Sequence, residues 1–233
     1  MSSDGLAELG ERTLFRVGGV SAIALGLSYL VITGLYVLAG GVPSGGEAWL
    51  EYLAAHTAVW WTILGLSVLT DFLFLPVAWS LYLALKSANS NATLLGAGLL
   101  VSFAVLDLAV TWPNYASLIS FSGDYAAATT DAQRAASVAA TSYPLAVLTS
   151  GLFAVYAILV PSLGILVVSL VMLRGVFGKS IAYLGVLTGV LGIISVVGPF
   201  FLTALDATVI VTSILTTLWV LLVGYRMLRF DRR

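Results

Sequence analysis

The stretch VWWTILGLSVLTDFLFLPVAWSLYLAL, residues 59–85, is almost entirely apolar and contains a single charged residue, Asp71. A bilayer core about 30 Å thick is crossed by about 20 helical residues, so this stretch is long enough to span a membrane as a helix. It is too long and too uniformly apolar for the alternating strands of a barrel. We therefore expect a transmembrane helix with a carboxylate near its middle.

The composition of the whole chain agrees with this expectation. Of its 233 residues, 60% are hydrophobic and 9% are charged, whereas soluble domains carry about 25% charged residues. The chain has no cysteine, which excludes disulfides, thiolate metal sites and cysteine nucleophiles. Its single histidine, His56, excludes the multi-histidine zinc and haem sites. We expect an integral membrane protein without a metal or cofactor.

Six apolar runs have the length of a membrane span. They cover roughly residues 17–40, 59–85, 92–117, 144–173, 179–202 and 207–229. The first run is longer than the apolar core of a signal peptide and follows a stretch of mixed charge, so we interpret it as a retained helix. The expected fold is an all-α, polytopic transmembrane six-helix bundle in which residues 1–233 form a single membrane domain.

The distribution of basic residues predicts the orientation. Nine of the ten basic residues lie on one side of the six spans, namely Arg12, Arg16, Lys86, Arg174, Lys179, Arg226, Arg229, Arg232 and Arg233. The opposite side holds Arg134 among several Asp and Glu residues. Because cytoplasmic loops are enriched in Lys and Arg, both termini are expected in the cytoplasm.

Two outer segments are long enough to form structure of their own. Residues 41–58 begin with the turn-forming GGVPSGGE and continue with Trp49, Leu50 and Leu53 on one helical face. Residues 119–142 contain an alanine-rich stretch that Asp124 opens. We expect both segments to form short helices that lie on the outer leaflet.

Asp71 is the first candidate for a functional residue. The helical rise from Trp60 places Asp71 about 15 Å below the outer interface. An ionised Asp at that depth costs at least about 2.5 kcal/mol, so Asp71 must be protonated, paired or close to water. Ser67 lies one turn before Asp71 on the same helical face.

Asp107, in the next span, is the second candidate. Asp107, Thr111 and Asn114 occupy positions i, i+4 and i+7, which gives them one helical face. The connection between the two spans has about six residues, so this polar face can lie opposite Asp71 and Ser67. One interpretation is an outward-opening polar pocket in which titratable carboxylates bind or transport a small amphipathic solute. The other is a pair of protonated carboxylates that hydrogen-bond across helices and stabilise their packing.

Small residues mark another helix face. Gly185, Gly189 and Gly192 share one face of the fifth span, and small residues at this spacing let a neighbouring helix approach closely. Packing within the chain is the first interpretation of this face, and contact with a second copy is the alternative.

Known membrane enzymes have motifs that this chain lacks. The contexts of the two carboxylates are LTDF and VLDL rather than Gly-x-Gly-Asp, no span carries a histidine, and no Walker loop is present. We therefore do not expect an enzyme.

Three stretches carry a family resemblance. They are SLYLALKSANSNATLLGAGL (80–99), DAQRAASVA (131–139) and VMLRGVFGKSIAYLGVLTGVLGII (171–194). Together they resemble the domain-of-unknown-function 4386 family, a group of small six-span prokaryotic membrane proteins. The resemblance implies a six-helix fold and a prokaryotic plasma (inner) membrane, and it supplies no activity or catalytic residues.

Two functions remain open at this point. The first is binding or transport of a small amphipathic ligand or lipid at the carboxylates. The second is a structural or regulatory module that binds other membrane proteins or a second copy. The expected surroundings are the lipid bilayer, and nothing in the composition indicates nucleic acid.

Overall fold

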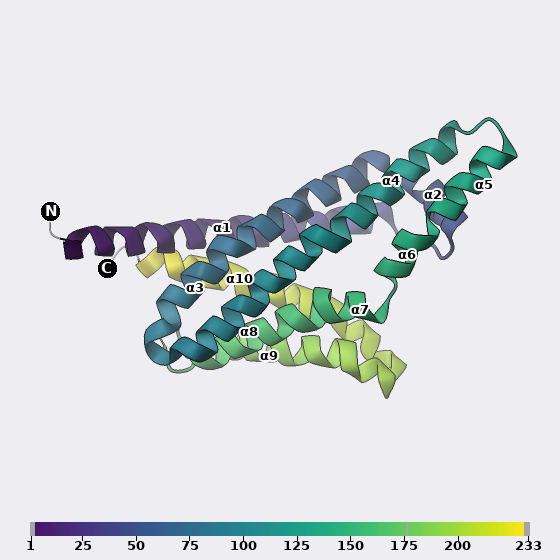
Figure 1. Ribbon diagram of the computed structural model, residues 1–233. Coiled ribbons are helices and arrows are strands. Elements are labelled where there is room, and N and C mark those ends of the chain that lie inside the picture. Colours follow the sequence, from purple (N-terminus) through teal and green to yellow (C-terminus); the bar gives the residue numbers. More distant parts are fainter. Residues whose placement is uncertain (1–2, 176, 231–233) are drawn as a thin grey trace.

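The computed structural model describes residues 3–175 and 177–230, whose regular structure is entirely helical, without strands (Figure 1). The α-helices are α1 (Ser3–Ala39), α2 (Gly46–Ala55), α3 (Thr57–Leu106), α4 (Trp112–Ala127), α5 (Asp131–Ala140), α6 (Ser142–Leu148), α7 (Gly151–Ala154), α8 (Val160–Met172), α9 (Lys179–Val197) and α10 (Thr208–Phe230). Two π-helical turns, η1 (Asp107–Thr111) and η2 (Val155–Leu159), join α3 to α4 and α7 to α8. Two 3₁₀ turns, η3 (Gly198–Phe200) and η4 (Thr203–Ala207), connect α9 to α10. The all-helical class predicted from the sequence is confirmed.

In the described part of the chain, five helical segments are long and apolar enough to cross a membrane. They are Thr13–Ala39, Thr57–Ala127, Gly151–Met172, Lys179–Phe200 and Thr203–Arg229. The number differs from the expected six because the expected spans 59–85 and 92–117 are counted together in the segment Thr57–Ala127, although a kink at Asn89 divides it.

That segment reverses its direction at a single residue. Asn89 has extended backbone angles (φ −164°, ψ 95°) inside α3. Its side-chain Oδ1 accepts the N–H of Ala92 at 3.1 Å, so Asn89 caps the N-terminus of the second arm as asparagine commonly does. The two arms, residues 57–88 and 90–106, therefore run in opposite directions (Figure 1).

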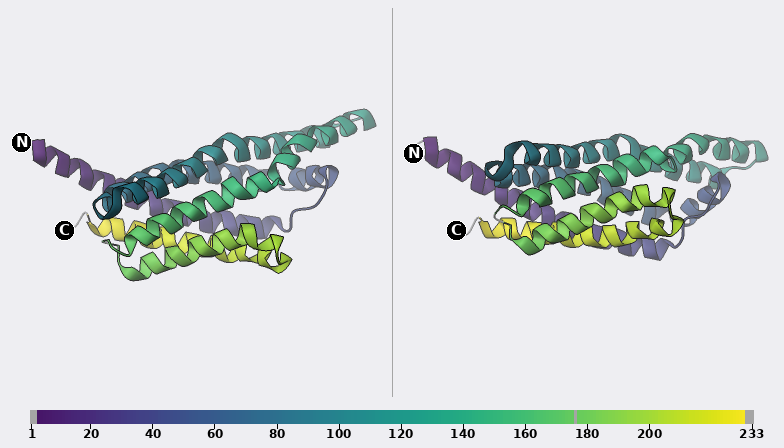
Figure 2. Two further views of the ribbon diagram at one scale, coloured as in Figure 1. Left: turned by 60° about the horizontal axis from the view of Figure 1, so that its bottom comes forward. Right: turned by 90° about the horizontal axis from the view of Figure 1, so that it is seen from below.

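The long helices form one closed bundle. α1 packs against α3 and α10, α9 packs against α10 and α8, and α8 packs against α3. The start of α1 and the end of α10 lie at the same end of the bundle as the reversal of α3, whereas α2, α5 and α6 lie at the other end (Figures 1 and 2). We call these the terminal end and the far end. The side chain of Arg12 is not described, and Arg232 and Arg233 lie outside the described residues.

Glycines set how closely the helices approach. A Cβ on Gly164 of α8 would lie 3.0 Å from the carbonyl oxygen of Gly96 in α3, and one on Gly189 of α9 would lie 2.7 Å from that of Ser162 in α8. Cβ positions on Gly185 and Gly192 would likewise overlap side chains of α8, those of Ser169 and Ser162. The glycine face of α9 is thus directed at α8 within this chain.

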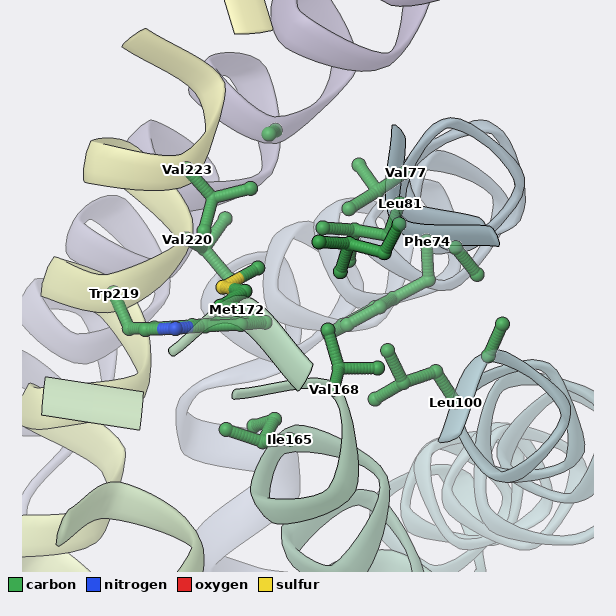
Figure 3. Packing of buried hydrophobic residues seen from close by; sticks show 14 of the residues in the cluster. Phe74, Val77, Leu81, Leu100, Ile165, Val168, Met172, Trp219, Val220 and Val223 are labelled. Carbon is green, nitrogen blue, oxygen red and sulfur yellow. The ribbon is translucent and has the colours of Figure 1, made fainter. Parts of the chain in front are cut away.

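The core of the bundle is built from the side chains that the long helices turn toward one another. Figure 3 shows Phe74 and Leu81 of α3 near Val168 and Met172 of α8, with Trp219 of α10 close by. All five side chains are at most 2% exposed. Many apolar residues elsewhere on the long helices are exposed, as a helix in contact with lipid requires.

The segments at the far end differ in detail from the sequence-based expectation. The helical segment expected over 144–173 is interrupted after α6, and Ser150 then caps α7 by accepting the N–H of Phe153 at 3.2 Å. α5 begins at Thr130, which forms a capping box with Gln133, rather than at Asp124. α2 does bury Trp49, Leu50 and Leu53, but it packs against α4.

Candidate functional site

Asp71 lies in the middle of the first arm of α3 and is buried, with 1% of its surface exposed. Its Oδ2 accepts a hydrogen bond from the indole N–H of Trp112 at 2.6 Å. Trp112 is the first residue of α4, on the continuation of the second arm, so the bond joins the two arms across the hairpin. The buried carboxylate therefore has a neutral hydrogen-bond donor as its partner.

Asp107 is also buried and forms the start of a second hydrogen-bonded chain. Its carboxylate accepts a hydrogen bond from the hydroxyl of Thr111, and the Thr111 hydroxyl lies 3.1 Å from the hydroxyl of Tyr156. Tyr156 belongs to η2, so this chain links the α3–α4 segment to the segment that leads into α8. Both carboxylates thus hold neighbouring helices together through polar contacts.

Two wide helical turns position these residues. In η1 the N–H of Trp112 bonds to the carbonyl of Asp107, and in η2 the N–H of Val160 bonds to that of Val155, five residues back in each case. Each turn is followed by a proline in the second position after it, Pro113 and Pro161. A proline ring crowds the carbonyl four residues before it. Those carbonyls lie within η1 and η2, where the wider turn gives them room.

The two carboxylates act on each other and on one tyrosine of α1. Asp71 and Asp107 are close enough for a direct electrostatic interaction. Tyr29 interacts electrostatically with both of them. We use the term carboxylate cluster for Asp71, Asp107, Thr111, Trp112 and Tyr156, and Tyr29 adjoins this cluster.

The structure brings together some of the residues expected from the sequence and separates others. Asp71, Asp107 and Thr111 lie in the carboxylate cluster. Ser67 is buried one turn away, where its carbonyl accepts a hydrogen bond from Thr70 at 2.7 Å. Asn114 instead donates to the carbonyl of Val110 on its own helix at 2.7 Å.

Sequence reasoning missed Trp112 and Tyr156 as partners of the carboxylates. Trp112 lies near the outer end of the span expected over 92–117, where aromatic residues commonly mark the membrane interface, and Tyr156 lies within an apolar run. A signal exists in the related spacings DLAVTWP (107–113) and VYAILVP (155–161), each of which ends in a proline six residues after its first position. π-turns are often found at functional sites, so this repeated spacing marks both residues.

Aromatic side chains cover the carboxylate cluster on the side of the far end. The Tyr115 ring stacks on Trp112 at 5.8 Å and on Trp60 at 5.5 Å between ring centroids. Trp60 also contacts Trp49 of α2 at 5.9 Å and Tyr36 of α1 at 5.6 Å. The outward-opening pocket expected at the two carboxylates stays a prediction, and this aromatic layer lies on their far-end side.

A cavity of about 330 Å³ lies beside the cluster instead. Its lining comes from four helical segments, and the residues are Tyr29, Ile32, Thr33, Tyr36, Phe74, Phe103, Ala157, Ile158, Pro161, Ser162, Ile165, Val209, Thr212, Ser213, Thr216 and Thr217. Neither Asp71 nor Asp107 is among these lining residues. Tyr29 connects the two features, because it lines the cavity and interacts with both carboxylates.

The chemistry of the cavity wall is amphipathic and carries no cation. Aromatic and aliphatic side chains come from all of the lining segments, whereas aliphatic-chain hydroxyl groups come mostly from α10. The described residues contain no group of three or more His, Asp or Glu side chains that could hold a metal ion. The site is therefore suited to noncovalent binding of an organic molecule with an apolar part.

Fold and site together describe an all-helical protein with several apolar helices of membrane length around a partly polar interior. No family model, curated protein or solved structure matches this chain. The resemblance to the domain-of-unknown-function 4386 family therefore stays a prediction.

Proposed function

We propose that this chain is a multi-pass protein of a prokaryotic plasma membrane that binds or transports a small amphipathic solute. The solute lies in the cavity between α1, α3, α8 and α10. The observation that carries this proposal is the placement of Tyr29, which lines the cavity and lies within the electrostatic reach of Asp71 and Asp107. A volume of about 330 Å³ is at the lower end for ligand sites, which favours a small solute.

The proposed topology has six crossings with both termini in the cytoplasm. The reversal at Asn89 supports the count, since the arm over residues 57–88 has a helical length of about 48 Å and exceeds the bilayer core. The distribution of charge supports the orientation. Lys86 lies at the reversal of α3, and Arg174 and Lys179 flank the α8–α9 turn, at the same end of the bundle as the two termini.

The cavity then lies in the outer half of the membrane. Near the terminal end, Gly19 and Gly26 of α1 are in close contact with α10, and their Cβ positions would overlap Leu228 and Leu221. Nearer the far end, Thr33 of α1 and Ser213 of α10 both line the cavity. The two helices are thus closed on the cytoplasmic side and leave room between them on the outer side, which is the arrangement of an outward-accessible site.

The carboxylates give this site its polarity. A charged group near mid-membrane is costly, and such groups commonly mark the path of an ion or a substrate. Asp71 accepts a hydrogen bond from the Trp112 indole, and a carboxylate can accept several hydrogen bonds. Its protonation state, and with it the field at Tyr29 and in the cavity, can therefore respond to a bound solute.

The test uses four eight-carbon probes that differ in their polar ends: octylamine, octyltrimethylammonium, octanol and octanoate. Equilibrium binding of each radiolabelled probe is measured on the purified full chain in lipid nanodiscs, with empty nanodiscs as background. At least one probe is expected to bind saturably. Ser213→Trp, which fills the cavity, is expected to abolish that binding.

Ile214→Trp is the matched control, because Ile214 is the next residue of α10, is exposed, and is not among the cavity-lining residues. Asp71→Asn is expected to weaken binding of the best probe by at least about tenfold, since it removes the titratable group that acts on Tyr29. Absence of saturable binding by all four probes, or equal binding by Ser213→Trp and Ile214→Trp, would remove the proposed function.

A further inference from the structure

Several hydroxyl groups of the cavity lining have a common hydrogen-bonding state. Four of them donate their hydrogen to a carbonyl of their own helix, at 2.8–2.9 Å. The bonds run from Thr33 to Tyr29, from Thr212 to Thr208, from Ser213 to Val209 and from Thr217 to Ser213. We call these four residues the hydroxyl wall.

A hydroxyl has one hydrogen to donate and two lone pairs that accept. Once the hydrogen is bound to the helix, the oxygen offers the cavity only acceptor capacity. The hydroxyl wall therefore favours a ligand that brings hydrogen-bond donors.

The remaining surroundings favour a positive ligand with an apolar tail. The lining includes no Lys, Arg or His, and the carboxyl groups of Asp71 and Asp107 lie behind Tyr29. Across from the hydroxyl wall, Phe74, Phe103, Ile158 and Ile165 form an apolar surface. Burying an alkyl chain there contributes roughly 25 cal/mol per Å² of apolar area removed from water.

We propose that the cavity selects a protonated primary alkylamine, whose ammonium group donates to the hydroxyl wall and whose chain lies along the apolar surface. This inference rests on the proposed function and specifies its ligand class. An ammonium has three donors and no acceptor, which complements a wall of acceptors. A quaternary ammonium carries the same charge without a donor, and a carboxylate brings only further acceptors and a repelling charge.

The order of affinities among the four eight-carbon probes tests the inference. Radiolabelled octylamine is displaced by the three unlabelled probes on the full chain in nanodiscs. Octylamine is expected to bind at least about tenfold more tightly than octyltrimethylammonium, because charge-assisted hydrogen bonds are lost in the latter. Octanol is expected to be intermediate, and octanoate is expected not to compete.

Two isosteric variants test whether the hydroxyl wall causes the preference for octylamine. Thr212→Val removes one acceptor of the hydroxyl wall and is expected to weaken octylamine binding by about tenfold while octyltrimethylammonium binding stays the same. Thr208→Val is the control, because Thr208 also donates to its own helix, to Leu205 at 2.6 Å, but does not line the cavity.

The outcomes separate this inference from the proposed function. If octyltrimethylammonium, octanol or octanoate binds as tightly as octylamine, and Ser213→Trp abolishes that binding, the selectivity is wrong and the binding function stands. If Thr212→Val and Thr208→Val behave alike, the hydroxyl wall does not select the ligand. If none of the four probes binds saturably, both proposals fail together.

Discussion

The helices α1 and α10 pack differently at the two ends of their contact. Near the terminal end the backbones touch, since a Cβ on Gly224 would lie 2.9 Å from the carbonyl oxygen of Gly19. Toward the far end Gly34 has no neighbour within 4 Å, and Thr33 and Ser213 line the cavity. The cavity thus begins where the close glycine contacts between α1 and α10 end. The same two helices pack tightly at the terminal end and line the cavity toward the far end.

The regularity of the helices differs in the same way. The first arm of α3 remains α-helical through Pro76, and close to Pro76 the hydroxyl of Ser80 donates to the carbonyl of Leu14 in α1 at 2.8 Å. The segments nearer the far end contain both π turns, η1 and η2, and both contribute to the carboxylate cluster. The close packing of α1 against α10 therefore lies toward the terminal end, and the two π turns lie nearer the far end.

A substitution at the close glycine contact between α1 and α10 is expected to have the largest effect on stability. In Gly224→Leu the new Cβ would meet Ala22, the carbonyl oxygen of Gly19 and the N–H of Ile23 at 2.9–3.0 Å, and the backbone atoms among them cannot move aside cheaply. We expect a loss of about 1–3 kcal/mol or more in the free energy of unfolding. The melting temperature of the purified protein in detergent measures it.

Gly34→Leu makes the same chemical change on the same helix pair where there is open space. Leucine is a better helix former than glycine, so this control is expected to melt at or above the wild-type temperature. Equal melting temperatures of the two leucine variants would show that the close contact at Gly224 does not hold the helices together.

Trp112→Phe is expected to have the next largest effect. It keeps an aromatic ring against Tyr115 but removes the N–H that Asp71 accepts at 2.6 Å. A buried carboxylate that loses its donor costs about 1–3 kcal/mol. Trp61→Phe, at a position that is 45% exposed, is the control and is expected to change the melting temperature little.

The double variant Asp71→Asn with Trp112→Phe tests whether the two side chains act as a pair. If they do, the double variant is expected to lose less stability than the sum of the two single losses. Strict additivity would contradict a direct contact between the Asp71 carboxylate and the Trp112 indole.

Composition and apolar runs were sufficient to predict the helical fold and the membrane-length segments. Uniform apolar runs leave few alternatives to helix, and the turn at Gly178, where φ is 93°, coincides with an expected short connection. The reversal of α3 was placed in the right region, although as a loop of about six residues rather than at Asn89 alone. A single capping side chain is enough to end one helix and begin the next, and propensity reasoning does not resolve that.

The site was predictable only in part. Helical periodicity found Asp71, Asp107 and Thr111, because buried carboxylates are rare in apolar runs. It failed for Asn114, since a π turn adds a residue and changes which side chains share a face beyond Thr111. It also failed for the cavity, whose walls are ordinary Thr, Ser and apolar residues from helices far apart in the sequence.

Asn114→Ala is expected to have the smallest effect on stability. Asn114 lies just beyond the residues of the carboxylate cluster in the sequence. Because the Asn114 amide donates to Val110 of its own helix, its removal leaves that carbonyl with its helical partner. We expect a change within about 0.5 kcal/mol in stability and no change in probe binding.

Thr111→Val, three residues earlier, is the contrast. Thr111 joins the Asp107 carboxylate to the Tyr156 hydroxyl, so its loss is expected to leave two buried groups without a partner and to cost about 1–3 kcal/mol. If the alanine variant at Asn114 lost as much stability as Thr111→Val, the uninterrupted stripe predicted by α-helical periodicity would be the better description. The π turn at Asp107–Thr111 would then not separate the cluster from the helix that follows it.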